Sequence, residues 1–150
     1  MADSSLKIRI QDEVKAAMRS GDKPRLGALR LITAAIKQVE VDSRIEMTDS
    51  DVIAVLDKMC KQRRESIEQY SKAKRDDLVA VEEAELAIIG EFLPKPLTEG
   101  EITALIDDAV KQTGAGSIRD MGKVMAIIKP KAQGRADMGK LSGLIKARFG

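Results

Sequence analysis

The sequence predicts an all-α protein, in which an N-terminal four-helix domain precedes a small three-helix domain. Apolar residues recur at spacings of three and four along most of the 150-residue chain, and no segment shows the alternation typical of a strand. One stretch interrupts this pattern: in Pro94-Lys95-Pro96 neither proline donates an amide hydrogen, and the residue before each favours extended backbone. We therefore expect a boundary here, between an N-terminal helical domain over residues 1–93 and a basic C-terminal domain over residues 97–150.

Two helices are expected before residue 40. An apolar stripe from Leu6 to Met18 predicts the first helix, which should stop at Gly21. Asp22 followed by Pro24 is typical of a helix start, because proline fits the first turn and aspartate caps free amides. The stripe of the second helix then runs over residues 26–39.

A polar, aperiodic loop is expected over residues 41–47, before the third helix. Thr48 and Asp51 have the spacing of a capping box, so the third helix is expected to begin there and to end at about Lys74. The fourth helix is predicted from residues that recur at helical spacing. They are Leu78, Val81, Glu85, Ile88, Ile89 and Phe92.

The C-terminal domain contains a repeat. A second capping box at Thr98 and Glu101 opens the fifth helix, and Ser117 is placed to cap the sixth. The sequence Asp120-Met121-Gly122-Lys123 then returns seventeen residues later as Asp137-Met138-Gly139-Lys140. Two short helices are predicted to begin alike, each with an aspartate able to cap its first amides.

The repeat also places a glycine near the start of each of these helices. Gly122 and Gly139 lower helix stability, so we expect either a close backbone crossing or a phosphate approaching the helix start. The neighbouring aspartates would repel an anion, which favours close packing. Between the helices, Pro130 is expected to stop the first and Gly134 to permit the turn.

Charge is distributed unevenly along the chain. Eight bases and two acids lie between Ser117 and Gly150, a net charge of +6, whereas the remaining residues carry −4. Such bases either keep the surface solvated and pair with the acidic stretch 76–108, or form the electrostatic footprint of a nucleic-acid-binding protein. Aromatic residues make up 2% of the chain, too few for a base-stacking platform, so an RNA contact should read backbone and shape. The candidate phosphate contacts are Lys123, Lys129, Lys131, Arg135, Lys140 and Lys146.

The residues that usually carry catalysis are scarce. There is no histidine, and Cys60 lies on the apolar face of the third helix, where a buried structural thiol is expected. Met121-Gly122-Lys123-Val124 lacks the glycine spacing, the hydroxyl residue and the preceding strand of a phosphate-binding loop. We therefore predict no catalytic residue, no metal site and no cofactor.

Three features of the sequence predict a cytoplasmic protein with no membrane contact. The chain has a single cysteine, it lacks a start of the signal-peptide type, and it lacks an apolar run of membrane length.

Several motifs together resemble one family. These are Lys61-Gln62-Arg63-Arg64-Glu65-Ser66, Glu83-Ala84-Glu85-Leu86, Phe92-Leu93-Pro94, Asp120-Met121-Gly122-Lys123-Val124-Met125, Lys129-Pro130-Lys131 and Gly134-Arg135-Ala136-Asp137. Their order and spacing are similar to those of the YqeY-like proteins, whose tail resembles that of the B subunit of the tRNA-dependent amidotransferase. Many relatives have glycine directly after that last aspartate, where this chain has Met138 and then Gly139.

The resemblance implies a non-catalytic tRNA-binding accessory module, with a tRNA synthetase or an amidotransferase as candidate protein partner. Two alternatives stay open. One is a component of a carbon–nitrogen ligase that uses glutamine as amido donor and is active only with partner subunits. The other is a protein–protein adaptor that docks through the long third helix or the acidic fourth helix. The sequence leaves the oligomeric state undetermined.

Overall fold

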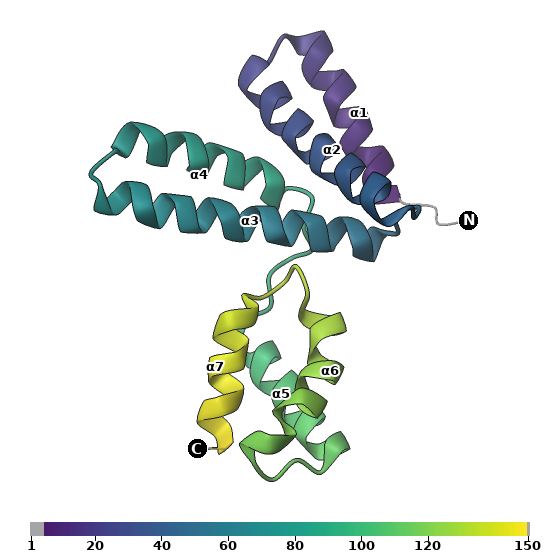
Figure 1. Cartoon of the computed structure of the whole chain (residues 1–150), viewed down its shortest axis with the longest axis vertical. Helices are drawn as coiled ribbons and strands as arrows, with labels where there is room; N and C mark the ends of the chain where they lie inside the picture. The colour runs from purple at the N-terminus through teal and green to yellow at the C-terminus, as the bar shows by residue number, and fades with distance from the viewer. Residues whose placement is uncertain (1–4, 150) are drawn as a thin grey trace. The chain divides into compact units, whose positions relative to one another are not determined.

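The computed structural model describes residues 5–149, which form seven α-helices and one short 3-10 helix with no strand in that range (Figure 1). The prediction of an all-α protein is confirmed. The chain divides into two compact units, Met1–Leu93 and Pro94–Gly150, which we call unit 1 and unit 2. The division falls at the first proline of the predicted break.

Unit 1 is built from two helical hairpins (Figure 1). The first joins α1 (Ser5–Ser20) to α2 (Lys23–Ser43), and the second joins α3 (Asp49–Lys72) to α4 (Asp76–Gly90). With 24 residues, α3 is about 36 Å long at 1.5 Å per residue, so its far end reaches beyond the helices that cover its start.

The predicted helix starts in unit 1 agree with the structure. Gly21, with φ of +73°, makes the turn after α1, and the Asp22 side chain accepts a hydrogen bond from Arg25 N at 3.1 Å. At the start of α3, Thr48 Oγ1 accepts from Asp51 N, and the Asp51 carboxylate accepts from Thr48 N, which completes the capping box.

The end of α2 differs from the prediction. The helix continues through Val41 to Ser43, although residues 41–47 were expected to form a loop. An exposed helical turn needs no apolar residue, so the loss of periodicity there did not mark the helix end. The end is set instead by Arg44, which takes a left-handed conformation with φ of 54°.

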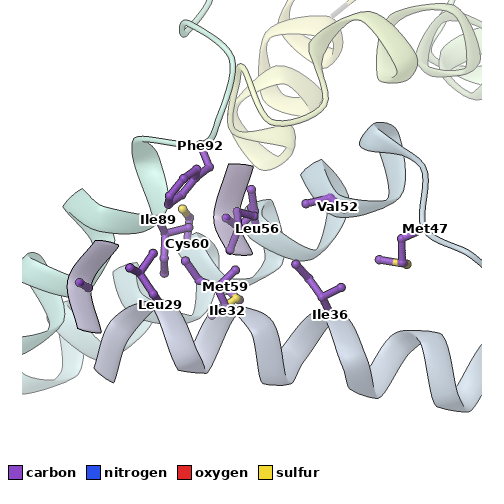
Figure 2. Packing of buried hydrophobic residues seen from close by; sticks show 12 residues of the cluster. Leu29, Ile32, Ile36, Met47, Val52, Leu56, Met59, Cys60, Ile89 and Phe92 are labelled. Carbon is purple, nitrogen blue, oxygen red and sulfur yellow. The ribbon is translucent and has the colours of Figure 1, made fainter. Parts of the chain in front are cut away.

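The core of unit 1 lies where the two hairpins meet (Figure 2). Its largest fully buried side chains come from all four helices, and Cys60 is buried among them as predicted. The cluster comprises Ile10, Ala17, Leu29, Ile32, Ile36, Met47, Val52, Leu56, Met59, Cys60, Ile89 and Phe92.

The far part of the second hairpin lies outside this core. No residue between 61 and 88 is buried, although this range includes half of α3 and most of α4. Val81, one of the residues whose helical spacing predicted α4, is 56% exposed. The helix forms as expected, but α1 and α2 do not extend over this part of the hairpin, so its outer side is left uncovered in residues 5–149.

Unit 2 contains α5 (Glu99–Thr113), a 3-10 helix (Ile118–Asp120), α6 (Met121–Ala132) and α7 (Met138–Phe149). The sequence repeat is reproduced in the packing of α6 and α7, since residues seventeen apart are buried at equivalent positions. The buried cluster comprises Ile106, Ala109, Val124, Ile128, Ala132, Leu141 and Ile145.

Two predictions for unit 2 are wrong. Pro130 lies inside α6 rather than ending it, because a proline near the last turn removes only its own amide bond and two more residues complete the helix. The Asp120 side chain makes no capping bond to α6; instead its Oδ2 accepts from Gly116 N at 3.1 Å. Gly134, with φ of +77°, makes the turn before α7, as expected.

Candidate nucleic-acid interface

Five of the six predicted phosphate contacts are exposed lysines. Lys123, Lys129 and Lys131 lie on α6, and Lys140 and Lys146 lie on α7. Lys131 was expected in the joining loop, but it belongs to the last turn of α6 because the helix continues past Pro130. None of the five forms an ion pair with a carboxylate in residues 5–149, so their charges are not used to hold unit 2 together.

The repeat gives these lysines related positions. Lys123 precedes buried Val124 as Lys140 precedes buried Leu141. Lys129 and Lys146 likewise follow the buried isoleucines of their helices. On each helix the two lysines are six residues apart, about 120° around the axis at 3.6 residues per turn. Each helix therefore presents ammonium groups on two flanks, a distribution suited to a polyanion rather than to a single small anion.

The two acids of the tail do not neutralise these lysines by direct contact. Asp120 is bound to the Gly116 amide, and Asp137 Oδ1 accepts a hydrogen bond from Gly139 N at 2.8 Å. Both carboxylates thus serve the local backbone, and neither forms an ion pair within the described part of the chain.

Arg135 differs from the other candidates. Its side chain is half-buried: Nε donates to the Lys95 carbonyl at 2.8 Å, and the guanidinium lies 3.6 Å from the Glu101 carboxylate. Its own carbonyl accepts from Leu97 N at 2.8 Å. Arg135 therefore fastens the segment before α5 to the α6–α7 turn. Sequence reasoning missed this role because no local pattern indicates a contact between residues forty positions apart.

Glu101 is held at this same place. Its carboxylate accepts from the Thr98 backbone amide, which together with the Thr98 hydroxyl and nearby Arg135 lowers the pKa of Glu101.

The two remaining arginines of the tail differ from each other. Arg148 pairs with Asp107 on α5. In contrast, Arg119 is exposed and forms no ion pair in the described chain, so we add it to the candidate phosphate contacts. In the sequence, only its position among the bases of the tail could have indicated this.

The expected close packing at the repeat glycines is wrong. A Cβ at Gly122 would meet no atom within 4 Å outside its own helix backbone and chain neighbours. At Gly139 it would meet only the Asp137 carboxylate, at 3.2 Å. No second backbone approaches either glycine, because α6 and α7 pack through the opposite faces that carry Val124 and Leu141.

Outside the lysines, the described residues offer little chemistry. Cys60 is 1% exposed, and burial raises the pKa of its thiol, which disfavours the thiolate. Residues 5–149 contain no group of three or more potential metal ligands. A hollow of about 440 Å³ lies between α1 and α2, and its lining includes Ile10, Ile36 and the ion pair of Lys7 with Glu40.

Comparison with known proteins decides the family. The family described as "Yqey-like protein" matches residues 7–149. The chain belongs to the YqeY-like family. This match confirms the resemblance drawn from the sequence motifs, and it spans both units.

Several fungal relatives of this YqeY-like chain carry the same name, "Altered inheritance of mitochondria protein 41, mitochondrial". The protein from Pyrenophora tritici-repentis is 35% identical over 130 residues, which cover 85% of this chain and 71% of the relative. The protein from Eremothecium gossypii is 33% identical over 67% of this chain and 56% of its own length. The Saccharomyces cerevisiae protein is 31% identical over 69% of this chain and 55% of its own length. The chain thus spans little more than half of these last two relatives.

The expected cytoplasmic location is contradicted by these names, which describe the relatives as mitochondrial proteins. Composition misled the prediction because a single cysteine indicates a reducing compartment without distinguishing one such compartment from another. No helix in the described range is both long and apolar enough to cross a membrane.

Proposed function

We propose that this YqeY-like chain is a non-catalytic RNA-binding module whose ligand is tRNA. The observation that carries the proposal is the set of exposed lysines on α6 and α7 that form no ion pair in the described chain. A folded RNA presents phosphates along a curved backbone, and lysines spread over two flanks of two helices suit that geometry.

Other features of the molecule are consistent with a binding role. The tail carries a net charge of +6 with few aromatic residues to stack on bases, which favours recognition of backbone and shape over sequence. The resemblance of the tail to the amidotransferase B subunit narrows the RNA to tRNA. Cys60, the one side chain suited to release ammonia from glutamine, is buried in the core of unit 1.

The proposal is tested by measuring tRNA affinity over a range of salt concentrations. If the five lysines each meet a phosphate, the plot of log K against log[salt] should have a slope of about −3.5 to −4.5, at 0.7–0.9 per contact. Lys129→Ala/Lys131→Ala should make this slope shallower by about 1.5 units, while stability changes by less than about 0.5 kcal/mol per exposed site.

The matched control is Lys58→Ala/Lys61→Ala on α3, which also removes two exposed ammonium groups. This variant should bind tRNA as the unmodified chain does. Loss of binding in the α3 variant and retention in the α6 variant would place the RNA site on unit 1 and refute the proposal.

The absence of catalysis is tested separately. We expect the purified chain to release no ammonia from glutamine, with or without ATP and misacylated tRNA. Ammonia release that disappears in Cys60→Ala would establish the amidotransferase alternative instead.

A further inference from the structure

The helix α4 contains more apolar residues than the fold buries. Nine of its 15 residues are Ala, Val, Leu or Ile, yet Ile89 is its only buried residue. Leu78, Val79 and Val81 are absent from the unit 1 core cluster. A helix that is apolar on several sides is normally covered on several sides. Within the described chain, α4 therefore has an apolar surface without a partner.

That surface follows one side of the helix. Ala80, Val81, Ala84 and Ala87 are exposed, and Ile88 is half-buried. Their spacings of three and four place them along one side of α4, which we call the α4 stripe. Val81 supplies its largest exposed side chain, and the alanines leave room for another backbone to approach.

The charges beside the stripe have a single sign. The helix carries five acids and no base. Asp77 pairs with Arg75 and Glu85 with Arg63, but Asp76, Glu82 and Glu83 form no ion pair in residues 5–149. Glu83 is three residues after Ala80 and four before Ala87, so it borders the stripe directly.

We propose that the α4 stripe binds a basic amphipathic helix of a partner protein. The alanine-rich surface fits the close packing of two helices, with an apolar side chain of the partner against Val81. Lysines or arginines flanking the partner's apolar face would meet Asp76 and Glu83, which form no ion pair within residues 5–149. A second copy bound through the same stripe is disfavoured, because it would bring two acid-only helices together. The acids also repel RNA, so this surface is distinct from the lysines of unit 2.

The experiment uses the full chain and a synthetic 18-residue helix of leucine and lysine, labelled with a fluorophore, in which the leucines follow helical spacing. A peptide with glutamate in place of lysine is the charge control. Fluorescence anisotropy should show binding of the lysine peptide and not of the glutamate peptide. Ala84→Lys should weaken binding at least about tenfold, because it places a bulky cation in the stripe. Glu83→Lys should weaken it by a smaller factor.

The matched control is Ala104→Lys on α5, which adds the same charge at another exposed alanine and should leave affinity within about twofold. Circular dichroism melting establishes that each variant is folded. Equal binding by Ala84→Lys and the unmodified chain would overturn the proposal, as would equal binding of the two peptides or no binding of the lysine peptide. A dimer of the free chain in sedimentation that Ala84→Lys dissociates would also overturn it, because a second copy would then cover the stripe.

Discussion

The two units of this chain use basic residues differently. In unit 1, several ion pairs join one helix to another, one through Lys7 and the others through arginine. Arg25 on α2 binds Glu13 on α1 and Glu91 after α4, and Arg63 on α3 binds Glu85 on α4. In unit 2, the ion pairs of the described residues involve arginine, and no lysine takes part. The guanidinium group presents several donors in a fixed plane and suits structural pairing, whereas the ammonium group on its flexible stem stays hydrated. The lysines of unit 2 are thus available for a ligand.

The units also differ in the size of their cores. The buried cluster of unit 1 contains 12 of the described residues, and that of unit 2 contains seven. A small unit buries a smaller share of its surface, so its free energy of unfolding is smaller. Loss of one core side chain should therefore affect unit 2 more.

The largest expected effect separates the two cores. Leu141→Ala in unit 2 and Leu56→Ala in unit 1 each remove a fully buried leucine, and each should lower stability by about 2–5 kcal/mol. Scanning calorimetry should show two transitions. Leu141→Ala should lower the melting temperature of the unit 2 transition only, and should leave that unit barely folded. A single transition shifted equally by both variants would show that the units unfold together.

The next effect concerns the ion pairs of unit 1. Arg25→Ala removes contacts of 3.0 Å to Glu13 and 2.7 Å to Glu91, so α1, α2 and the end of α4 lose a shared partner. We expect a loss of about 1–2 kcal/mol in urea unfolding, since the side chain is partly exposed. In unit 2, Lys129→Ala is the comparison and should change stability by less than about 0.5 kcal/mol. Equal losses would remove the distinction between structural arginines and free lysines.

A smaller effect tests the glycines of unit 2. Gly122→Ala should raise stability by about 0.5–1 kcal/mol, because alanine favours the helix and its Cβ meets no atom within 4 Å. Gly134→Ala should lower stability, because φ there is +77°. If Gly122→Ala melts higher but binds tRNA more weakly, the glycine serves ligand approach. If Gly122→Ala instead lowers stability, the role of Gly122 is to allow another element to pack closely against α6.

The smallest effect is a dependence on acid pH. The Arg25 side chain, through its hydrogen bond, lowers the pKa of Glu91 below its ordinary value of 4.5. The unfolded chain then binds a proton more readily than the folded chain, so this stabilisation is present above about pH 4.5 and is lost as pH falls through the folded pKa. The melting temperature of unit 1 should therefore fall less steeply between pH 5 and 3 in Arg25→Gln than in the unmodified chain. If it falls equally steeply in both, carboxylates other than Glu91 cause the loss of stability.

The sequence by itself determined the helices and the signals that start them. Capping boxes at Thr48 and Thr98 act within four residues, so their local pattern was sufficient. The seventeen-residue repeat likewise predicted two short, related helices, and α6 and α7 bury matching positions because both turn the same face to one core. The charge of the tail and the absence of histidine also followed directly from the residues.

Only the tertiary structure decided which side chains have partners. Helical spacing placed Val81 on α4 without showing whether another helix covers it, and in the fold its side chain is 56% exposed. Arg135 appeared equivalent to the lysines until the fold brought it to the carbonyl of Lys95. The glycines of the repeat appeared to mark a close crossing that the packing does not contain. In each case the deciding neighbour, or its absence, lies outside the local segment, and local spacing carries no information about such distant contacts.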